Sequence, residues 1–437
     1  MPGPRVLFIC AEPVGERPLG VAIRTIELAR VLSTHADVTI AGVAPSAAVA
    51  GAPPVVSYKI FGSPRRSGLG ALVAQADAVV ALPPWPHLAA LLRRARARVV
   101  YDVYDPEPFE VAERLRGDGA AKRRLVTTLT NDRVLRALAD ADHLMCASEK
   151  QRDLWLGAML GERTLTPEEQ YRDPTLRGRI DLVPFGIPAE RPVASGPGAG
   201  ARFPQIAPDD ELILWNGGIW AWLDAPSAIR AIALLRERRP NVRLVFMGAS
   251  TMPAARRAAG EAHDLAAQLG LLDTHVFFND EWVPYGQRAD WLLEASCLLS
   301  AQTDHLETRF AFRTRLLDGI WAGVPIVCTG GDDLAEQVER EGLGATAAAG
   351  DPASIAAALE QVLGAGRGAF SARLAAVAPR YAWPSVAAPL VDWVTSGEPP
   401  RPRARAAVRP GQRVRDAGFR AALAALHTVG IERLPSL

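Results

Sequence analysis

Short apolar runs alternate with longer segments of helical periodicity along the first 190 residues of the chain. The run at 5–11 is continuously apolar, which is typical of a strand covered on both faces. Further strands are predicted at 37–43, 76–85 and 97–109, the last two ending in proline-rich loops. Between the first two runs, apolar residues recur at helical spacing in the segment VAIRTIELARVLS. Repeated strand, loop and helix of this kind predicts βαβ units and a parallel sheet.

The same alternation starts again at residue 211. Strands are predicted at 211–218, 243–250 and 275–280, and Leu298–Thr329 contains a buried strand, a charged loop, a helix and a second buried strand. A chain of 437 residues is also too long for one ordinary core. The predicted fold class is therefore α/β, with two Rossmann-like, doubly wound domains. We expect a first domain at 1–190, a linker rich in Pro, Gly, Ala and Ser at 191–208, a second domain at 209–381, a helix at 382–395 that returns to the first domain, and a basic tail with a short amphipathic helix at 396–437.

Composition narrows the class of protein. A net charge of +1 argues against a general nucleic-acid binder. Four cysteines lie in apolar runs and are not spaced like a metal site or a disulfide framework, which favours a reducing compartment. The N-terminus lacks the features of a signal peptide, and no apolar run approaches the roughly 20 residues needed to cross a bilayer. We therefore expect a cytoplasmic protein.

The charged residues of Leu298–Thr329 gather where a strand ends and a helix begins. In a parallel sheet the carboxyl ends of strands open onto a crevice, and a helix N-terminus there attracts anions. Arg309, Arg313 and Arg315 are predicted to bind phosphates, because the planar guanidinium grips phosphate oxygens and keeps its charge. The competing interpretation is that these arginines form a solvated helix face.

Several motifs resemble those of a known family. They are VPFGI at the end of the first half, GG in the first strand and loop of the second half, FMG after the next long helix, and LLDGIWAGVPIV. In these motifs the chain resembles the retaining glycosyltransferases of the GT-B fold, in particular glycosyltransferase family 4, over most of residues 5–395. The resemblance implies two Rossmann-like domains facing a central cleft, a nucleoside diphosphate sugar as donor substrate, and neither a metal nor a cofactor.

The resemblance also implies where the donor binds. Gly217 and Gly218 would form a turn against the diphosphate, and Asp318 would hold the ribose. The base would lie against the loop after HVFFND, although which base is not predicted. Competing interpretations are a plain tight turn for the glycines, an ordinary ion pair of Asp318 with Arg315, and a packing role for the tryptophans. The full set of predicted donor-binding residues is Gly217, Gly218, Trp220, Gly248, Trp282, Val283, Arg309, Arg313, Arg315 and Asp318.

The catalytic residues of the family are only partly matched. Phe310 stands where the first of two family carboxylates usually lies, and Glu307, three residues earlier, is predicted to replace it. In the run YDVYDP, Tyr104 takes the place of a usual histidine beside Asp105. The predicted catalytic residues are thus Glu307, Asp105 and Tyr104, with a helix cap as the alternative role for Asp105.

The first domain is expected to hold the acceptor. Gly15 and Gly20 lie in a loop before a helix, whose amides would face a ligand. Ser148 and Glu149 match a family position at the floor of the cleft. The alternative for Ser148 is a helix N-cap, with Gln151 completing a capping box.

We expect a retaining glycosyltransferase that moves a sugar to a hydroxyl of a glycan, a lipid-linked molecule or a small molecule by a front-face mechanism. The alternatives are a catalytically silent GT-B subunit that binds a nucleotide or a partner enzyme, and a nucleotide-sugar epimerase. The basic tail is predicted to contact an anionic membrane surface as a peripheral anchor. The alternative interpretation is that the tail is a disordered extension or a dimer contact.

Overall fold

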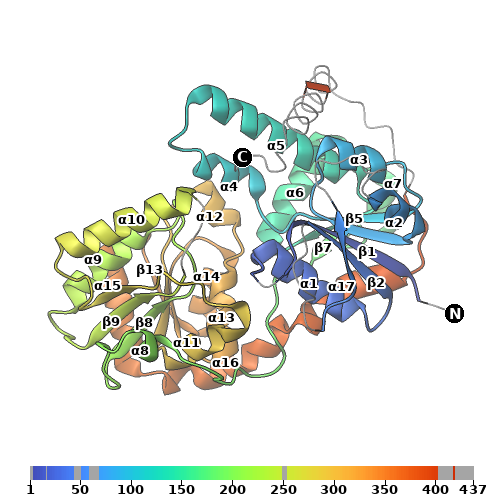
Figure 1. Ribbon diagram of the computed structural model, residues 1–437. Coiled ribbons are helices and arrows are strands. Elements are labelled where there is room, and N and C mark those ends of the chain that lie inside the picture. The colour runs from blue at the N-terminus through green and yellow to red at the C-terminus, as the bar shows by residue number, and fades with distance from the viewer. Residues whose placement is uncertain are drawn as a thin grey trace. The chain divides into compact units, whose positions relative to one another are not determined.

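The computed structural model describes residues 3–15, 17–43, 51–58, 68–248, 253–401 and 417–418 of the chain (Figure 1). These residues form two compact units. The first consists of Met1–Pro184 together with Val386–Leu437, and the second of Phe185–Ser385. Each unit is built around one parallel sheet flanked by helices, as the alternation of strand and helix patterns predicts.

The first unit contains a seven-stranded sheet in the order β3-β2-β1-β4-β5-β6-β7. The order reverses between β1 and β4, which makes that point the topological switch of the sheet. Three of its strands are buried along their whole length, as continuous apolar runs predict, whereas the edge strand β3 is largely exposed and has no such run. Its strands are β1 (Arg5–Pro13), β2 (Asp37–Val43), β3 (Val55–Tyr58), β4 (Ala78–Ala81), β5 (Arg98–Asp102), β6 (His143–Cys146) and β7 (Ile180–Leu182).

The helices of this unit lie between its strands along the chain. They are α1 (Gly20–Leu32), α2 (Leu69–Gln75), α3 (Pro86–Leu92), α4 (Glu107–Arg114), α5 (Ala120–Asp140), α6 (Glu149–Gly161) and α7 (Pro167–Arg172).

The helix predicted at 382–395 is α17 (Trp383–Thr395), and its residues from Val386 onward belong to the first unit. Arg98 donates to the carbonyl oxygens of Trp393 and Val394 at 2.8 and 2.6 Å. The Trp393 ring stacks on His143 with 5.4 Å between ring centroids. These contacts attach the end of the helix to the sheet of the first unit.

The second unit contains a six-stranded parallel sheet in the order β10-β9-β8-β11-β12-β13, with its switch point between β8 and β11. Its strands are β8 (Glu211–Trp215), β9 (Val242–Phe246), β10 (Val276–Phe278), β11 (Cys297–Ser300), β12 (Ile326–Thr329) and β13 (Gly344–Ala347). Its helices are α8 (Ala199–Arg202), α9 (Ala225–Leu235), α10 (Pro253–Gln268), the 3₁₀ turn η1 (Tyr285–Gln287), α11 (Arg288–Glu294), α12 (Leu306–Phe310), α13 (Thr314–Ala322), α14 (Asp333–Glu341), α15 (Pro352–Ala365) and α16 (Gly368–Tyr381).

Aspartates and glycines set the ends of several helices in the second unit. Asp224, Asp332 and Asp351 each accept hydrogen bonds from amides in the first turn of α9, α14 and α15. Gly323 and Gly342 follow α13 and α14 in the left-handed conformation, which glycine adopts without steric cost. The helices therefore start immediately after the strand-end loops.

The stretch 191–208, which is predicted to be a linker, lies within the second unit and contains α8. The Ser195 and Gly196 amides donate to a carboxylate oxygen of Asp290 at 2.5 and 3.0 Å. Ala199 is fully buried. The chain passes from one unit to the other before this stretch, at Pro184, and again after Ser385.

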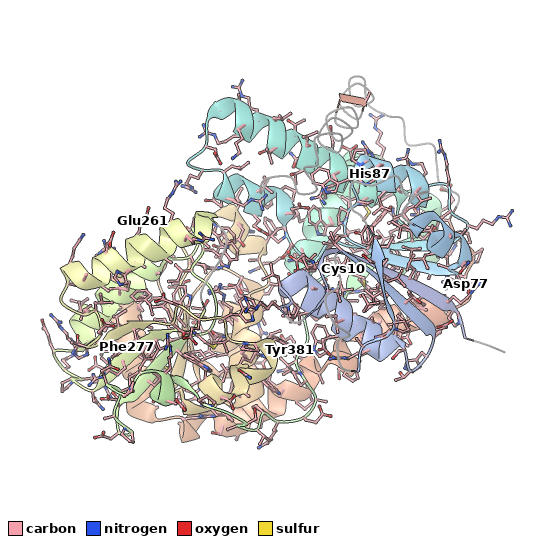
Figure 2. The ribbon with its side chains drawn as sticks, viewed as in Figure 1. Cys10, Asp77, His87, Glu261, Phe277 and Tyr381 are labelled. Atoms are coloured by element: carbon pink, nitrogen blue, oxygen red, sulfur yellow. The ribbon has the colours of Figure 1, made fainter. Side chains whose placement is uncertain are left out.

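The four cysteines are buried in strands of the two sheets, as their apolar surroundings predict, and all four are free thiols. Figure 2 labels Cys10 on β1 of the first unit and Phe277 on β10 of the second. Both side chains are completely buried. Burial raises the pKa of the Cys10 thiol to about 11, so this thiol stays protonated at neutral pH.

Candidate functional site

Three glycines pack backbone to backbone at the switch point of the second sheet. Gly217 and Gly218 follow β8, and Gly217 has φ +150°. A Cβ atom on Gly248, which follows β9, would lie 2.5 Å from the carbonyl carbon of Gly217 and 2.7 Å from the amide nitrogen of Gly218. Only glycine at 248 therefore leaves room for this turn.

Arg315, at the start of α13, lies against that turn. Its Nη2 donates to the carbonyl oxygen of Gly218 at 2.6 Å, and its Cζ is 3.0 Å from the position that a Cβ on Gly217 would occupy. Burial lowers the pKa of Arg315 to about 10, which leaves it charged at neutral pH. Among the described residues its Nη1 is buried without a hydrogen-bond partner. The glycine turn thus carries a fixed cation with a donor to spare.

Arg313, two residues earlier, is engaged differently. Its guanidinium forms an ion pair with Asp332, and Nη2 donates to the carbonyl oxygen of Thr329 at 2.5 Å. The side chains of Arg313 and Asp332 are 3% and 0% exposed. This contact argues against the predicted role of Arg313 as a diphosphate ligand, because its guanidinium is turned inward to an acid that also caps α14.

Asp318 is held from two sides. Its Oδ1 accepts from Nε of Arg288 at 3.1 Å, and its Oδ2 accepts from Nδ2 of Asn216 at 3.0 Å. The same amide of Asn216 donates to the carbonyl oxygen of Arg315 at 2.9 Å. The ion-pair partner of Asp318 is thus Arg288, which lies 30 residues earlier, and the sequence predicts neither Arg288 nor Asn216 as a site residue.

Glu307 lies on the short helix α12, beside the histidine that caps it. Nδ1 of His305 accepts from the Thr308 amide at 3.1 Å, and Nε2 lies 3.3 Å from the carbonyl oxygen of Trp222. The Glu307 carboxylate is buried, with Oε2 3.7 Å from Nδ1 of His305. His305 therefore joins the loop after β11 to the loop after β8.

Trp220 and Trp222 stack on each other within the loop after β8, with 5.1 Å between ring centroids. Their neighbour across the loop is His305, through the Trp222 carbonyl. Arg309, also on α12, is exposed and its guanidinium lies 5.8 Å from the ring of Phe310. Of the two predicted ligands, Trp220 therefore lies in the loop after β8 and Arg309 on the helix that follows β11.

The loop predicted to hold the base is fixed by Asn279. Its Nδ2 donates to the carbonyl oxygens of Met247 and Glu281 at 2.9 and 2.8 Å, which ties the end of β9 to the loop after β10. Val283 packs against the core of the unit. Within the described part of the chain, the half-buried Trp282 has an indole nitrogen that is shielded from solvent and lacks a hydrogen-bond partner.

In the first unit a buried ion pair lies beneath Tyr104. Arg24 and Asp102 form two hydrogen bonds of 2.6 and 3.1 Å, and Arg24 also donates to the carbonyl oxygens of Val183 and Pro184. The guanidinium carbon of Arg24 lies 4.7 Å from the centre of the Tyr104 ring. The sequence does not predict Arg24 as a site residue, although an arginine among the apolar residues of a predicted helix is a signal that could have been used.

Acidic groups beside Tyr104 have raised pKa values. Burial and the nearby Glu110 raise the pKa of Asp105 well above its ordinary value, and burial raises that of Glu12 to about 7. Burial also raises the pKa of Tyr104 well above 10. Asp105 does not cap α4, because Pro106 is the N-cap residue and the first turn of the helix has no side-chain cap hydrogen bond.

The two predicted glycines of the first unit differ in exposure. Gly15 is buried after β1, and the exposed Gly20 begins α1. A Cβ on Gly20 would lie 4.0 Å from the hydroxyl of Tyr104. The fold thus brings Gly20 to the predicted catalytic tyrosine.

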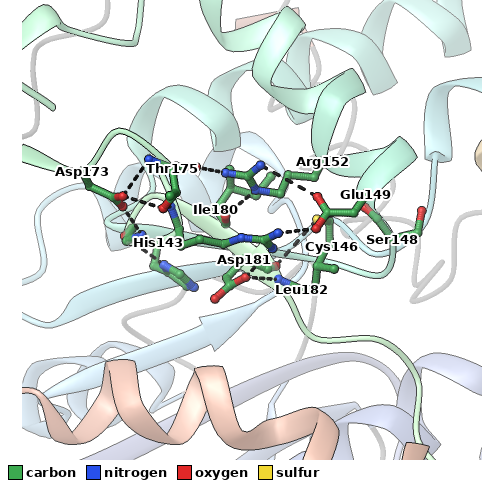
Figure 3. Close-up of polar contacts among 12 residues, drawn as sticks. His143, Cys146, Ser148, Glu149, Arg152, Asp173, Thr175, Ile180, Asp181 and Leu182 are labelled. Atoms are coloured by element: carbon green, nitrogen blue, oxygen red, sulfur yellow. Dashed lines mark hydrogen bonds and ion pairs between the residues drawn. The ribbon is translucent and has the colours of Figure 1, made fainter. Parts of the chain in front are cut away.

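Ser148 and Glu149 make structural contacts at the start of α6, and Figure 3 shows those of the Glu149 carboxylate. Ser148 is the N-cap and accepts from the Gln151 amide at 3.3 Å, which confirms the alternative role for it. The Gln151 side chain accepts from the Ala147 amide and donates to the carbonyl oxygen of Tyr104 at 2.6 Å. Glu149 forms an ion pair with Arg177.

Residues 211–365 match the family model described as "Glycosyl transferases group 1". This part of the chain is similar to the group 1 glycosyltransferases. The matched range includes the glycine turn, Arg315, Asp318 and Arg288. A search of curated protein sequences finds no match.

Solved structures similar to the chain span both units. WaaG, a glycosyltransferase involved in lipopolysaccharide biosynthesis, is 18% identical with a TM-score of 0.61, and the match covers 90% of this chain and 100% of that one. Anabaena Alr3699/HepE in complex with UDP-glucose is 15% identical with a TM-score of 0.64, over 90% and 100% of the two chains. The OtsA apo structure is 14% identical with a TM-score of 0.63, again over 90% and 100%. These likenesses show the GT-B fold.

Proposed function

We propose that the protein is a retaining glycosyltransferase that moves a sugar from a nucleoside diphosphate sugar to an acceptor hydroxyl. The observation that carries this proposal is the half-buried cation of Arg315 against the glycine turn, with a donor that has no partner among the described residues. A diphosphate would accept from that donor. Charge-assisted hydrogen bonds of this kind are the strong ones, and arginine suits phosphate oxygens.

The start of α13 would add to the diphosphate site. No acidic residue lies in its first turn, and the N-cap residue Arg313 makes no side-chain cap. The first amides of a helix carry partial positive charge and bind anions. Arg313 would act on this site indirectly, by fixing the loop before α13 to β12 and to Asp332.

The rest of the donor follows from the order of the loops. The ribose would lie on Asp318, the base on the loop that Asn279 ties down, and the sugar toward Glu307 and the tryptophan pair. HepE, a structural neighbour, is described in complex with UDP and with UDP-glucose, which makes UDP-glucose the first donor to test.

Transfer would proceed on one face of the sugar. The acceptor oxygen bonds to the anomeric carbon, the bond from that carbon to the diphosphate oxygen breaks, and the departing diphosphate takes the acceptor's proton. Tyr104 is a poor base at neutral pH, because its pKa is raised well above 10. The protein would therefore act mainly by positioning the reactants and stabilising the leaving diphosphate, both large effects in catalysis.

The acceptor is assigned to the first unit, and its class stays open among glycans, lipid-linked molecules and small molecules. The facing arrangement of the two domains stays a prediction. Among the described residues, no helix has the length and apolar character to span a membrane. The predicted amphipathic helix of the tail and its membrane contact lie outside the described residues, apart from 417–418.

The test is the fate of UDP-glucose incubated with the purified protein and followed by proton NMR. We expect slow release of glucose whose first-formed anomer is α, because retention preserves the configuration of the donor. A β anomer formed first would contradict retention. Conversion of the sugar while it is still on the nucleotide would identify an epimerase, and binding of UDP without any turnover of donors would identify a silent subunit. Addition of EDTA should leave the rate unchanged, because Arg315 and the α13 N-terminus are proposed to do the work of a metal ion.

A further inference from the structure

Arg288 lies between the loop predicted to hold the base and the carboxylate predicted to hold the ribose. It is the first residue of α11 and follows the 3₁₀ turn Tyr285–Gln287. Its Nη1 donates to the carbonyl oxygen of Tyr285 at 2.7 Å, and its Nε donates to Asp318 at 3.1 Å. One guanidinium therefore bonds to both parts of the nucleoside site.

Two aromatic rings fix the plane of this guanidinium. Its central carbon lies 3.6 Å from the centre of the Tyr285 ring and 4.3 Å from that of Trp321. Trp321 is itself held by a hydrogen bond from its indole nitrogen to the carbonyl oxygen of Glu190 at 2.7 Å. Cation–π contacts of this kind strengthen as the cation is desolvated, and the Arg288 side chain is only 7% exposed.

Asp318 is left with acceptor capacity on its outer side. Arg288 and Asn216 each occupy one carboxylate oxygen. An ionised carboxylate offers about four lone-pair sites, so two protein donors leave others for a ligand. The Asp318 side chain is 18% exposed, which gives a ligand access to them.

We propose that Arg288 is a positioning residue for ribose recognition, which aims the carboxylate of Asp318 at the 2′ and 3′ hydroxyls of the donor nucleotide. This inference rests on the proposed function, because it assumes that the nucleotide binds at this edge of the second unit. A planar guanidinium is required, since it must stack between two rings while it bonds to two oxygens in different directions. A lysine ammonium keeps the charge but cannot stack in this way.

The test compares the dissociation constants of UDP and 2′-deoxy-UDP by titration calorimetry in the wild type, Arg288→Lys and Asp318→Asn. We expect the wild type to prefer UDP by about tenfold, the value for one hydrogen bond to a charged group. In Arg288→Lys the affinity for UDP should fall by about tenfold while that for 2′-deoxy-UDP changes little, so the preference is lost. A variant that combines Arg288→Lys with Asp318→Asn should prefer UDP over 2′-deoxy-UDP to the same extent as Asp318→Asn alone.

Arg367→Lys is the matched control. This arginine also lies in the second unit and bonds to carbonyl oxygens, including those of Gly323 and Ala322 at the C-terminal end of α13, and no bond to Asp318 is among its described contacts. It should leave the preference for UDP unchanged. If Arg288→Lys does not fold, Tyr285→Leu removes one of the stacking rings and should lower the preference in part.

The outcomes separate the positioning role of Arg288 from the proposed function. If Arg288→Lys weakened the binding of UDP and of 2′-deoxy-UDP equally, the role of Arg288 would be merely structural and the inference would be overturned. The inference would also fail if the wild type bound both nucleotides equally well. If the wild type bound neither UDP nor any other nucleoside diphosphate, the proposed function itself would fail.

Discussion

The two units share a doubly wound plan but treat the charges at their switch points differently. In the first unit, Arg24 and Asp102 are buried and bonded to each other, and Arg24 also bonds to two carbonyl oxygens. The acids nearby, Glu12 and Asp105, have raised pKa values. In the second unit, Arg315 keeps a donor that no described residue uses.

The difference indicates which ligand suits each unit. A phosphate needs a cation with free donors, which the edge of the second unit has in Arg315. A carboxyl with a raised pKa repels an anion less and can exchange hydrogen bonds with a hydroxyl, which fits the acceptor role proposed for the first unit. The following predictions test this contrast.

The largest expected effect is that of Arg313→Ala on stability. Removing one partner of a buried ion pair costs about 3 to 5 kcal/mol, because the other charge stays buried. The loss should appear in chemical denaturation and as faster hydrogen exchange in β12 and α14. Arg309→Ala, on an exposed neighbour, should change stability by less than about 0.5 kcal/mol. If Arg313→Ala were as stable as the wild type, the ion pair with Asp332 would contribute little to the stability of the folded protein.

The next effect is that of Gly248→Ala. The added Cβ would lie 2.5 Å from the backbone of Gly217, so the glycine turn must move. We expect a loss of about 3 kcal/mol in stability and a weaker affinity for UDP. Gly260→Ala is the control, because nothing lies within 4 Å of its Cβ position on α10, and it should be neutral or stabilising. Unchanged UDP binding in Gly248→Ala would separate the turn from the donor site.

The smallest effect concerns Glu12 in the first unit. Its folded pKa of about 7 is above the ordinary value of 4.5, so the folded state binds this proton more tightly than the unfolded state does. Stability is therefore lost as pH rises from about 4.5 through 7. Glu12→Gln removes that loss, and the variant should gain on the order of 1 to 2 kcal/mol over the wild type between pH 4.5 and 8. If the difference in stability between Glu12→Gln and the wild type were the same at pH 4.5 and at pH 8, the raised pKa of Glu12 would be contradicted.

Periodicity predicts most of the fold. The runs at 5–11 and 37–43 correspond to β1 and β2, because buried parallel strands need continuous apolar residues. The edge strand β3 escapes prediction for the same reason, since it is mostly exposed. The stretch 191–208 has the composition of a linker, yet contacts with Asp290 hold it in the second unit, and composition does not encode such contacts.

The site is predicted less completely. Arg313 and Arg315 lie two residues apart and look equivalent in the sequence, but residues two apart on a helix point in different directions. One therefore faces Asp332 and the other the glycine turn. Arg288 and Asn216 reach Asp318 from 30 and 102 residues away, so only the folded chain shows that they lie beside this predicted ligand.

The most direct test of the central claim is the affinity of Arg315→Ala for UDP, measured by titration calorimetry beside Arg309→Ala. If Arg315 holds the diphosphate, its removal should weaken binding by about 10- to 100-fold, the value of one or two charge-assisted hydrogen bonds, while Arg309→Ala binds within about threefold of the wild type. Undiminished binding of UDP in a folded Arg315→Ala protein would contradict the account.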